Sequence, residues 1–405
     1  MTAPTEQTDP GERRVGEQAK VATAWVFVLA GATFATWASR IPDVRDSLGL
    51  APGQLGLLLL VGSCGSLVGL PLAGWVASRI GTRRTVLLGA SLAILGLTGA
   101  GLSAGPLHSF WLTAACLFVT LAGIGQWDVA MNIEGAQVEH RLGRHLMPKF
   151  HAAFSGGTVG TALLAAGLVA VGVPFALHFA VAAVLLLGCV VLASRAFLPR
   201  EATVSDSTDE AVGSSPARAW REPRTLLIGL VMLVAAFTEG TANDWISVAF
   251  VDGYHLPTWA GVLGFATFLT FMTIGRLVGA AMLDRWGRVP VLRAMLVGAG
   301  VGSLLVVFGT PLLAYLGAAI WGFGVSLGFP VGVSAASDEP RHAAARVSVV
   351  STIAYGAFLA GPPALGFLGD HWGVLRALGV VSALLLVALV ALPALRPPRT
   401  GSAPE

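Results

Sequence analysis

Charged side chains are scarce in this chain of 405 residues. Asp, Glu, Lys and Arg together make up 12% of it, about half of the roughly 25% usual in soluble domains. Hydrophobic residues make up 55%, and the mean hydropathy is +0.76. So few charges cannot cover a surface in water. The composition therefore indicates a membrane protein and argues against a disordered chain, a secreted disulfide scaffold and a cytosolic enzyme.

Cysteine is also scarce, with three residues that lie far apart in apolar runs. No CxxC pair or His/Cys cluster is present, so we expect no disulfide, no metal site and no cofactor. The histidines are spread along the chain, which gives no catalytic constellation and predicts that the protein is not an enzyme. The net charge of +3 is scattered rather than gathered in a basic stripe, which argues against nucleic acid as a partner.

Long apolar segments dominate what remains. A helix needs about 20 apolar residues to cross about 30 Å of hydrocarbon. Twelve segments meet this requirement, so the predicted fold class is an all-α membrane protein with twelve transmembrane helices. They lie at 21–39, 53–77, 85–104, 109–133, 150–171, 174–197, 225–250, 257–282, 290–308, 311–333, 344–369 and 373–393.

Basic residues separate by loop and predict the orientation. If both ends face the cytosol, 21 of the 25 Lys and Arg residues fall on the cytosolic side and three on the other, as the positive-inside rule requires. No cleavable signal peptide is visible. We expect a cytoplasmic (inner) membrane location and five parts: a cytosolic tail over 1–20, a six-helix bundle over 21–197, a flexible linker over 198–224, a second bundle over 225–393 and a tail over 394–405.

An internal repeat relates the two bundles. An offset of 206 residues aligns Gly69 with Gly275, Arg79 with Arg285, and Gly81 with Gly287. The segments around these residues resemble the G-x-x-x-D-R-x-G-R-R signature of the major facilitator superfamily, although Ser78 stands at the acidic position of the first copy. The resemblance implies two six-helix pseudo-repeats. It also implies a cytosolic charge network, here Arg79, Arg83, Arg84, Asp284, Arg285 and Arg288. Retention of topology alone is the other interpretation of Arg83 and Arg84.

Two further segments resemble the fucose-permease-like sugar:proton symporters of that family. They are 123–132, which reads GIGQWDVAMN, and 151–160, which reads HAAFSGGTVG. In those symporters an acidic residue lies in a small-residue run that ends in Asn, as Asp128 and Asn132 do here. The first-span acid associated with them has no match in this chain. The resemblance implies a sugar or related metabolite as the solute and leaves another substrate open.

Ionisable residues inside apolar runs are the candidates for coupling. A charge at the membrane centre is costly, so such residues usually face the bundle interior and are often functional. A carboxyl group there can take up and release a proton. We therefore predict that proton or substrate coupling involves Asp128, Glu239, His151 and Arg276. Structural pairing is the alternative for the acids, a capping role for His151, and snorkelling to the cytosol for Arg276.

Arg40 and Asp244 lie at the outer parts of spans one and seven, which are repeat partners. We predict that they form an ion pair at an outer gate, with two solvated charges as the alternative. Aromatic and amide side chains near the charged residues suit a polar solute, so we predict a substrate cavity lined by Trp37, Gln126, Trp127, Asn132, Asn243 and Trp245. Interfacial anchoring is the other interpretation of Trp37 and Trp245.

These features predict a secondary active transporter that works by alternating access. The expected partners are a small-molecule solute, protons and the lipid bilayer, and we expect a monomer. A proton-driven exporter of drugs or secondary metabolites stays open, as does a polytopic membrane protein without transport activity. A nucleotide-driven pump is excluded within the chain, because no Walker sequence is present.

Overall fold

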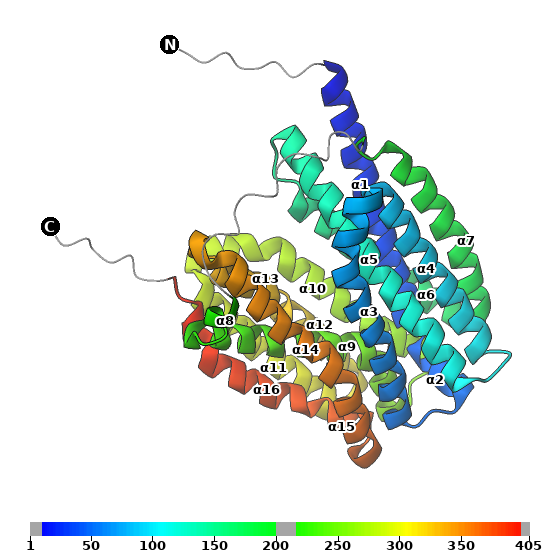
Figure 1. The fold of residues 1–405 in the computed structure, drawn as a ribbon. Helices are drawn as coiled ribbons and strands as arrows, with labels where there is room; N and C mark the ends of the chain where they lie inside the picture. The colour runs from blue at the N-terminus through cyan, green and yellow to red at the C-terminus, as the bar shows by residue number, and fades with distance from the viewer. Residues whose placement is uncertain (1–9, 200–215, 398–405) are drawn as a thin grey trace, which may run out of the picture. The chain divides into compact units, whose positions relative to one another are not determined.

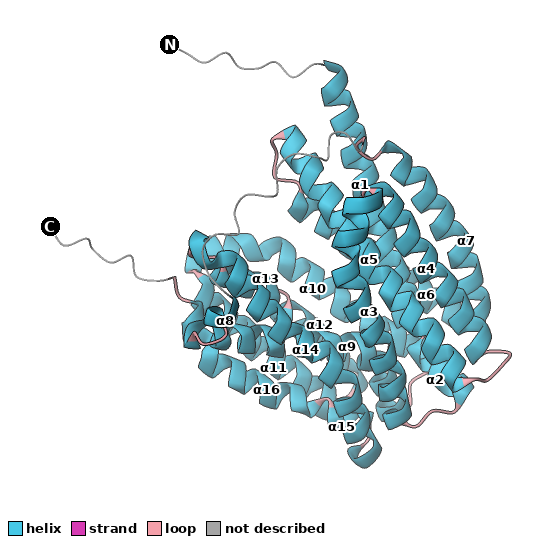
Figure 2. Ribbon diagram, viewed as in Figure 1, coloured by secondary structure: helices cyan, strands magenta, loops and turns pink. Residues whose placement is uncertain are grey.

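The computed structural model describes residues 10–199 and 216–397, which form helices joined by short loops (Figure 2). Twelve helical segments in this part are long and apolar enough to cross a membrane. Each overlaps one predicted span, so the prediction of an all-α membrane protein with twelve transmembrane helices is confirmed. The reason is local: an apolar run of this length satisfies its backbone hydrogen bonds internally only as a helix.

Contacts divide the chain into two units. The first comprises Met1–Arg40 and Val61–Asp206, and the second comprises Ile41–Leu60 and Ser207–Glu405. The helices of the N-terminal part of the chain are α1 (Pro10–Ala38), α2 (Ile41–Leu48), α3 (Pro52–Ile80), α4 (Thr82–Ala104), α5 (Phe110–Leu142), α6 (Met147–Ala170), α7 (Phe175–Ala193) and the 3-10 turn η1 (Ser194–Ala196) (Figure 1).

The C-terminal part begins with the short helix α8 (Pro216–Ala219). It continues with α9 (Pro223–Tyr254), α10 (Thr258–Trp286), α11 (Arg288–Phe308), α12 (Pro311–Val325), α13 (Gly328–Ala336), α14 (Pro340–Trp372), α15 (Val374–Ala377), α16 (Gly379–Ala391) and the 3-10 turn η3 (Leu392–Leu395). Several of these helices carry proline in their first turn, where its missing N–H has no helical partner to lose; they include α9, α12 and α14.

Helix packing repeats between the two units. In the first unit α1 packs on α6, α4 on α5, and α4 on α7. In the second unit the corresponding pairs are α9 with α14, α11 with α12, and α11 with α16. When the spans are numbered from one to six within each set, the same pairs are in contact in both sets: one with five, three with four, and three with six. This agreement supports the duplication that the sequence offset of 206 residues indicates.

Glycine makes the repeat visible in the backbone. Gly81 precedes α4 with φ 83° and ψ 161°, and Gly287 precedes α11 with φ 76° and ψ 167°. A side chain is strained at such positive φ values, so glycine is required for the tight turn between two antiparallel spans. Glycine also permits close helix approach, since a Cβ atom at Gly157 would lie 2.1 Å from the Val28 carbonyl oxygen.

Two features differ from the sequence-based expectations, and a third lies outside the described residues. Helix α1 starts at Pro10 rather than near residue 21, so part of the predicted tail is helical. Span ten is interrupted between α12 and α13. There the Ser326 hydroxyl bonds back to the Phe323 carbonyl at 2.8 Å, and Pro330 has no N–H to donate. Most of the predicted linker, residues 200–215, lies outside the described residues.

Residues 41–60 group with the second unit, although the sequence assigns them to the first bundle. They comprise α2 and the first turns of α3, and α2 packs on α9. At Gly56 a Cβ atom would lie 2.6 Å from the Pro362 carbonyl oxygen of α14. The start of span two thus lies against span eleven with backbone in contact with backbone.

Candidate solute and proton-coupling sites

Asp128 lies on α5 within the fourth span of the first unit. Its carboxylate has one side-chain contact, from the Asn132 amide at 3.4 Å, while the same amide donates to the Asp128 carbonyl at 2.8 Å. Both residues lie on one helix a single turn apart. Among the residues that the structure describes, no Lys, Arg or His forms an ion pair with Asp128.

The predicted cavity residues of the first unit are buried. Trp127 is 1% exposed and Gln126 8% exposed. The indole N–H of Trp127 and the amide oxygen of Gln126 have no hydrogen-bond partner within the described residues. Trp37 packs against Phe179, with ring centroids 6.4 Å apart. Buried polar groups normally have partners, so Gln126 and Trp127 are available to a bound solute or water.

His151 and Arg40 lie at opposite ends of the first unit's helices. His151 makes an edge-on contact with Phe27, with ring centroids 5.4 Å apart. Arg40 is 1% exposed, and its Nε donates to Nδ1 of His178 at 3.1 Å. Because Arg40 belongs to the first unit and Asp244 to the second, the gate between them stays a prediction. The bond to His178, on span six, was missed by sequence reasoning.

An ion pair inside the membrane occurs in the second unit. One terminal nitrogen of the Arg276 guanidinium, on α10, lies 3.1 and 3.3 Å from the two carboxylate oxygens of Glu239 on α9. The sequence left open whether Arg276 takes part in coupling or snorkels to the cytosol, and the structure pairs it with Glu239. Pairing offsets much of the cost of placing either charge within a span. Glu239 therefore differs from Asp128 in having a cation as its partner.

Asp244 lies on a different side of α9 and lines a small pocket between α9 and α14. Its carboxylate takes part in no hydrogen bond or ion pair with any residue of the second unit that the structure describes. Aromatic rings and two glycines surround it; the lining residues are Phe237, Gly240, Thr241, Asp244, Trp245, Ala357, Phe358, Gly361 and Pro362. The space beside the carboxylate is about 10 Å³, which is room for about one water molecule, so no solute fits beside Asp244 in this conformation.

Neighbouring polar groups on α9 share this lack of partners. The Asn243 amide oxygen, the Thr241 hydroxyl and the Trp245 indole N–H are all buried without a hydrogen bond in the described part of the chain. Thr241 and Trp245 also line the Asp244 pocket. The predicted residues Asn243 and Trp245 thus lie in a segment with unused hydrogen-bonding capacity.

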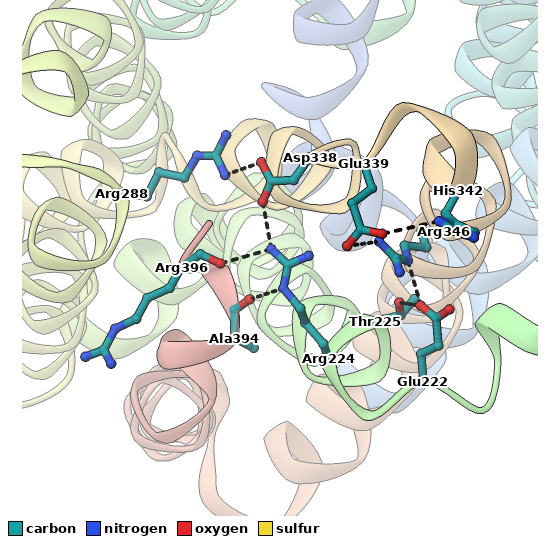
Figure 3. A network of polar contacts seen from close by, with 10 residues as sticks. All are labelled: Glu222, Arg224, Thr225, Arg288, Asp338, Glu339, His342, Arg346, Ala394 and Arg396. Carbon is teal, nitrogen blue, oxygen red and sulfur yellow. Dashed lines mark hydrogen bonds and ion pairs between the residues drawn. The ribbon is translucent and has the colours of Figure 1, made fainter. Parts of the chain in front are cut away.

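Asp338 joins two arginines at the end of the second unit predicted to be cytosolic (Figure 3). It accepts from Arg288 and from Arg224, each at 2.7 Å. Arg224 also donates to the carbonyls of Ala394 at 3.1 Å and Arg396 at 3.0 Å. Asp338 therefore links the starts of α9 and α11 to the chain end after η3.

A second cluster beside it centres on Arg346, which contacts Glu222 at 2.6 Å and Glu339 at 3.1 Å (Figure 3). Hydrogen bonding from Arg346 holds the pKa of Glu339 below its usual range. Burial opposes the charged form of Glu222, but hydrogen bonds from Arg346 and Thr225 outweigh it and lower its pKa. Both carboxylates are thus stabilised as anions.

The predicted network residues have different surroundings. Arg288 joins Asp338, whereas Arg79 and Arg285 lie over the neighbouring rings of Trp75 and Trp286, at 4.7 and 5.2 Å. Asp284 is exposed. Arg83 and Arg84 line a pocket at the start of α4.

Glu134 is a buried acid that sequence reasoning missed. It is fully buried on α5 and accepts from the Thr82 hydroxyl at 2.5 Å and from the Leu198 N–H at 2.7 Å. The 206-residue offset pairs Thr82 with Arg288, which donates to Asp338 in the other unit. The repeat thus relates the two donors, whereas the same offset places Glu134 opposite Pro340 rather than Asp338.

Polar contacts also occur at the opposite end of the second unit. Arg45 of α2 is 8% exposed and bonds to Asp252 of α9 and to Asp46. The N–H of Gly53, at the start of α3, donates to Asp370 of α14 at 2.9 Å. Asp370 thus satisfies one of the free N–H groups at a helix start. These contacts tie residues 41–60 to spans seven and eleven.

Twelve membrane-crossing helices in two repeated sets, with ionisable groups inside the spans, define a polytopic membrane transporter. A family model, the Major Facilitator Superfamily, matches residues 23–278 and 260–405. The chain belongs to this superfamily. An uncharacterised MFS-type transporter of Yersinia pestis is 32% identical over 385 residues, which cover 92% of this chain and 94% of that protein.

Solved structures have the same fold at low sequence identity. A variant of the nucleoside transporter NupG matches with a TM-score of 0.77 and 14% identity, over 94% of this chain and 99% of that one. A variant of the Escherichia coli fucose:proton symporter FucP matches with a TM-score of 0.64 and 14% identity, over 93% and 98%. The resemblance to this superfamily is thus confirmed.

Proposed function

We propose that this transporter moves a small polar solute, a sugar or a related metabolite, by proton-coupled alternating access. The observation that carries the proposal is Asp128, an acid within a span whose one side-chain contact is the Asn132 amide. A carboxylate without a cation in hydrocarbon is costly. Protonation removes this cost, so proton binding can be linked to the conformation of the protein.

The second unit supplies two further elements of the proposal. The space beside Asp244 is about 10 Å³ in the conformation described, and it widens into a solute subsite in another state of the alternating-access cycle. There the unpartnered Thr241 and Trp245 groups supply hydrogen bonds. The Glu239–Arg276 pair is a charge pair that can open when Glu239 takes a proton or when a solute competes for Arg276. NupG and FucP, whose names state a nucleoside and fucose with protons, support a hydroxyl-rich solute.

We further propose that the protein lies in the cytoplasmic membrane as a monomer, with both termini in the cytosol. The distribution of basic residues supports this orientation. In it, the Asp338 and Arg346 clusters lie on the cytosolic side and the Arg45–Asp252 contact on the outer side.

Reconstitution into proteoliposomes tests the proposal. An imposed pH gradient should drive accumulation of a solute from a panel of sugars and nucleosides, and Asp128→Asn should reduce it by about tenfold or more, as for other positioned proton carriers. Asp128→Glu keeps the carboxyl group and should retain more of the transport than Asp128→Asn. Solute exchange without any response to the pH gradient would contradict proton coupling, and full activity of Asp128→Asn would remove this residue from the mechanism.

A further inference from the structure

A pocket rich in arginine lies at the predicted cytosolic end of the first unit. It encloses about 620 Å³, and its walls come from the start of α4 and from the chain that follows α7. Arg83, Arg84 and Arg195 line it together with Thr82, Leu87, Phe197 and Leu198. We call it the α4–α7 pocket. Neither the solute site nor proton coupling uses these residues.

The three arginines carry positive charge that the described residues do not neutralise. Arg83, Arg84 and Arg195 are exposed and take part in no hydrogen bond or ion pair with any residue that the structure describes. The nearby acid, Glu134, is fully buried and already accepts from Thr82 and Leu198. It holds two wall residues of the pocket in place and leaves a net positive charge.

Arginine geometry and the helix start both favour phosphate. A guanidinium group presents parallel N–H donors that match phosphate oxygens. The first turn of α4, from Thr82, adds backbone N–H groups and the positive end of a helix that is 23 residues long. The chemistry that would satisfy this pocket is therefore a phosphate group with a net negative charge.

The position of the pocket selects a lipid as the source of that phosphate. Leu88, one turn beyond Arg84 on α4, is 40% exposed, and Leu192, one turn before Arg195 on α7, is 61% exposed. In a membrane-spanning helix, exposed leucines of this kind face acyl chains. The pocket thus places a basic cluster directly beside an apolar surface, as a phospholipid requires.

We propose that the α4–α7 pocket binds the headgroup phosphate of an anionic phospholipid, whose acyl chains lie along α4 and α7. The duplicated fold supplies an internal comparison. A pocket of about 610 Å³ at the start of α11 has Arg288, Arg293 and Arg396 in its lining. There Arg288 is already paired with Asp338, so this second pocket binds the same lipid more weakly.

Native mass spectrometry of the purified full chain, titrated with phosphatidylglycerol or phosphatidylcholine, tests the proposal. The wild type should retain phosphatidylglycerol in preference to phosphatidylcholine. Affinity should fall about fivefold for each arginine removed and about a hundredfold in Arg83→Gln/Arg84→Gln/Arg195→Gln. A control with Arg13→Gln, Arg14→Gln and Arg221→Gln removes three exposed arginines outside both pockets and should bind as the wild type does. Arg293→Gln/Arg396→Gln should lose less than the triple variant.

Competition separates a lipid from a soluble anion. Glycerol 3-phosphate carries the same phosphate without acyl chains and should not displace phosphatidylglycerol at equal concentration. Displacement by it would overturn the lipid assignment, and equal retention of both lipids would overturn the requirement for net negative charge. An unchanged affinity in the triple variant would overturn the location. If that variant does not fold, Arg84→Gln and Arg84→Lys give the same comparison, with a smaller loss expected for lysine.

Discussion

Arg276 and Glu239 form an ion pair of 3.1 Å between two neighbouring spans of the second unit. The pair explains how a guanidinium group is tolerated within a span, because its charge is balanced on the adjacent helix. It also distinguishes two of the acids on α9, since Glu239 has a cation as its partner within the described part of its unit and Asp244 has none.

Removing one member of this pair should cost more than removing both. Glu239→Gln leaves Arg276 without its anion and should lower the stability of the protein by about 1–3 kcal/mol. The double variant Glu239→Gln/Arg276→Gln should recover most of the loss. Thermal denaturation in detergent measures both effects, with Asp284→Asn as an exposed control that removes the same charge. Additive losses in the double variant would contradict the pairing.

Removal of the Glu134 carboxylate should lower the stability of the protein, although the residue lies near the end of a span. Glu134→Ala leaves the Thr82 hydroxyl and the Leu198 N–H buried without an acceptor, which should cost about 2–4 kcal/mol. Glu134→Gln keeps one acceptor oxygen and should cost less. Denaturation midpoints of the two variants check the order. A smaller effect for alanine than for glutamine would show that these hydrogen bonds are not what holds the segment.

The contact between Arg45 and Asp252 should show energetic coupling. Asp252→Asn leaves the buried Arg45 with Asp46 as its remaining carboxylate. A double-mutant cycle of Asp252→Asn with Arg45→Gln should give a coupling energy of about 1–2 kcal/mol. The matched comparison is Arg45→Gln with Asp370→Asn, because Asp370 bonds to Gly53 instead. Equal coupling in the two cycles would argue against a specific Arg45–Asp252 interaction.

Acid should remove the contribution of the Arg346 cluster. The pKa values of Glu222 and Glu339 are lowered in the folded protein. Their stabilisation is therefore fully present above the unfolded value of about 4.3 and is lost as the pH falls through the lower folded values. Wild type should exceed Arg346→Gln in stability by about 1–2 kcal/mol at neutral pH. This difference should shrink below pH 4.

Melting temperatures of wild type and Arg346→Gln over an acid series check this prediction. Arg221→Gln, an exposed arginine at the same end, is the control and should follow the wild-type profile. A difference that persists unchanged to low pH would assign the effect of Arg346→Gln to packing rather than to its two carboxylates.

Sequence reasoning predicted the spans because their signal is local. Apolar length determines each helix, and tight-turn glycines such as Gly81 and Gly287 mark where neighbouring helices meet. The contact partners of the charged residues were harder to predict from the sequence, because they depend on which helix faces pack together. Arg276 was assigned to coupling, with snorkelling to the cytosol as the alternative, and the packing of α9 on α10 places Glu239 beside it.

Glu134 and the acids of the Asp338 and Arg346 clusters were not predicted, because they lie outside the spans that the sequence indicates. Glu134 falls one residue past the predicted end of span four at residue 133, although α5 continues to Leu142. The contacts that connect different helices in the Asp338 and Arg346 clusters include pairs 50, 124 and 172 positions apart. No periodicity in a single sequence indicates contacts over such separations, whereas comparison of the two repeats could have indicated Thr82 and Arg288 as equivalent donors.

The grouping of residues 41–60 with the second unit has a consequence for dissecting the protein. A cut between residues 200 and 215 separates the two sets of six spans in sequence, yet the N-terminal fragment keeps Arg45, Gly53 and Gly56, whose neighbours lie in the other fragment. Neither piece made alone would hold a complete set of helix contacts. Fragments co-produced in one cell should therefore assemble and protect each other from proteolysis.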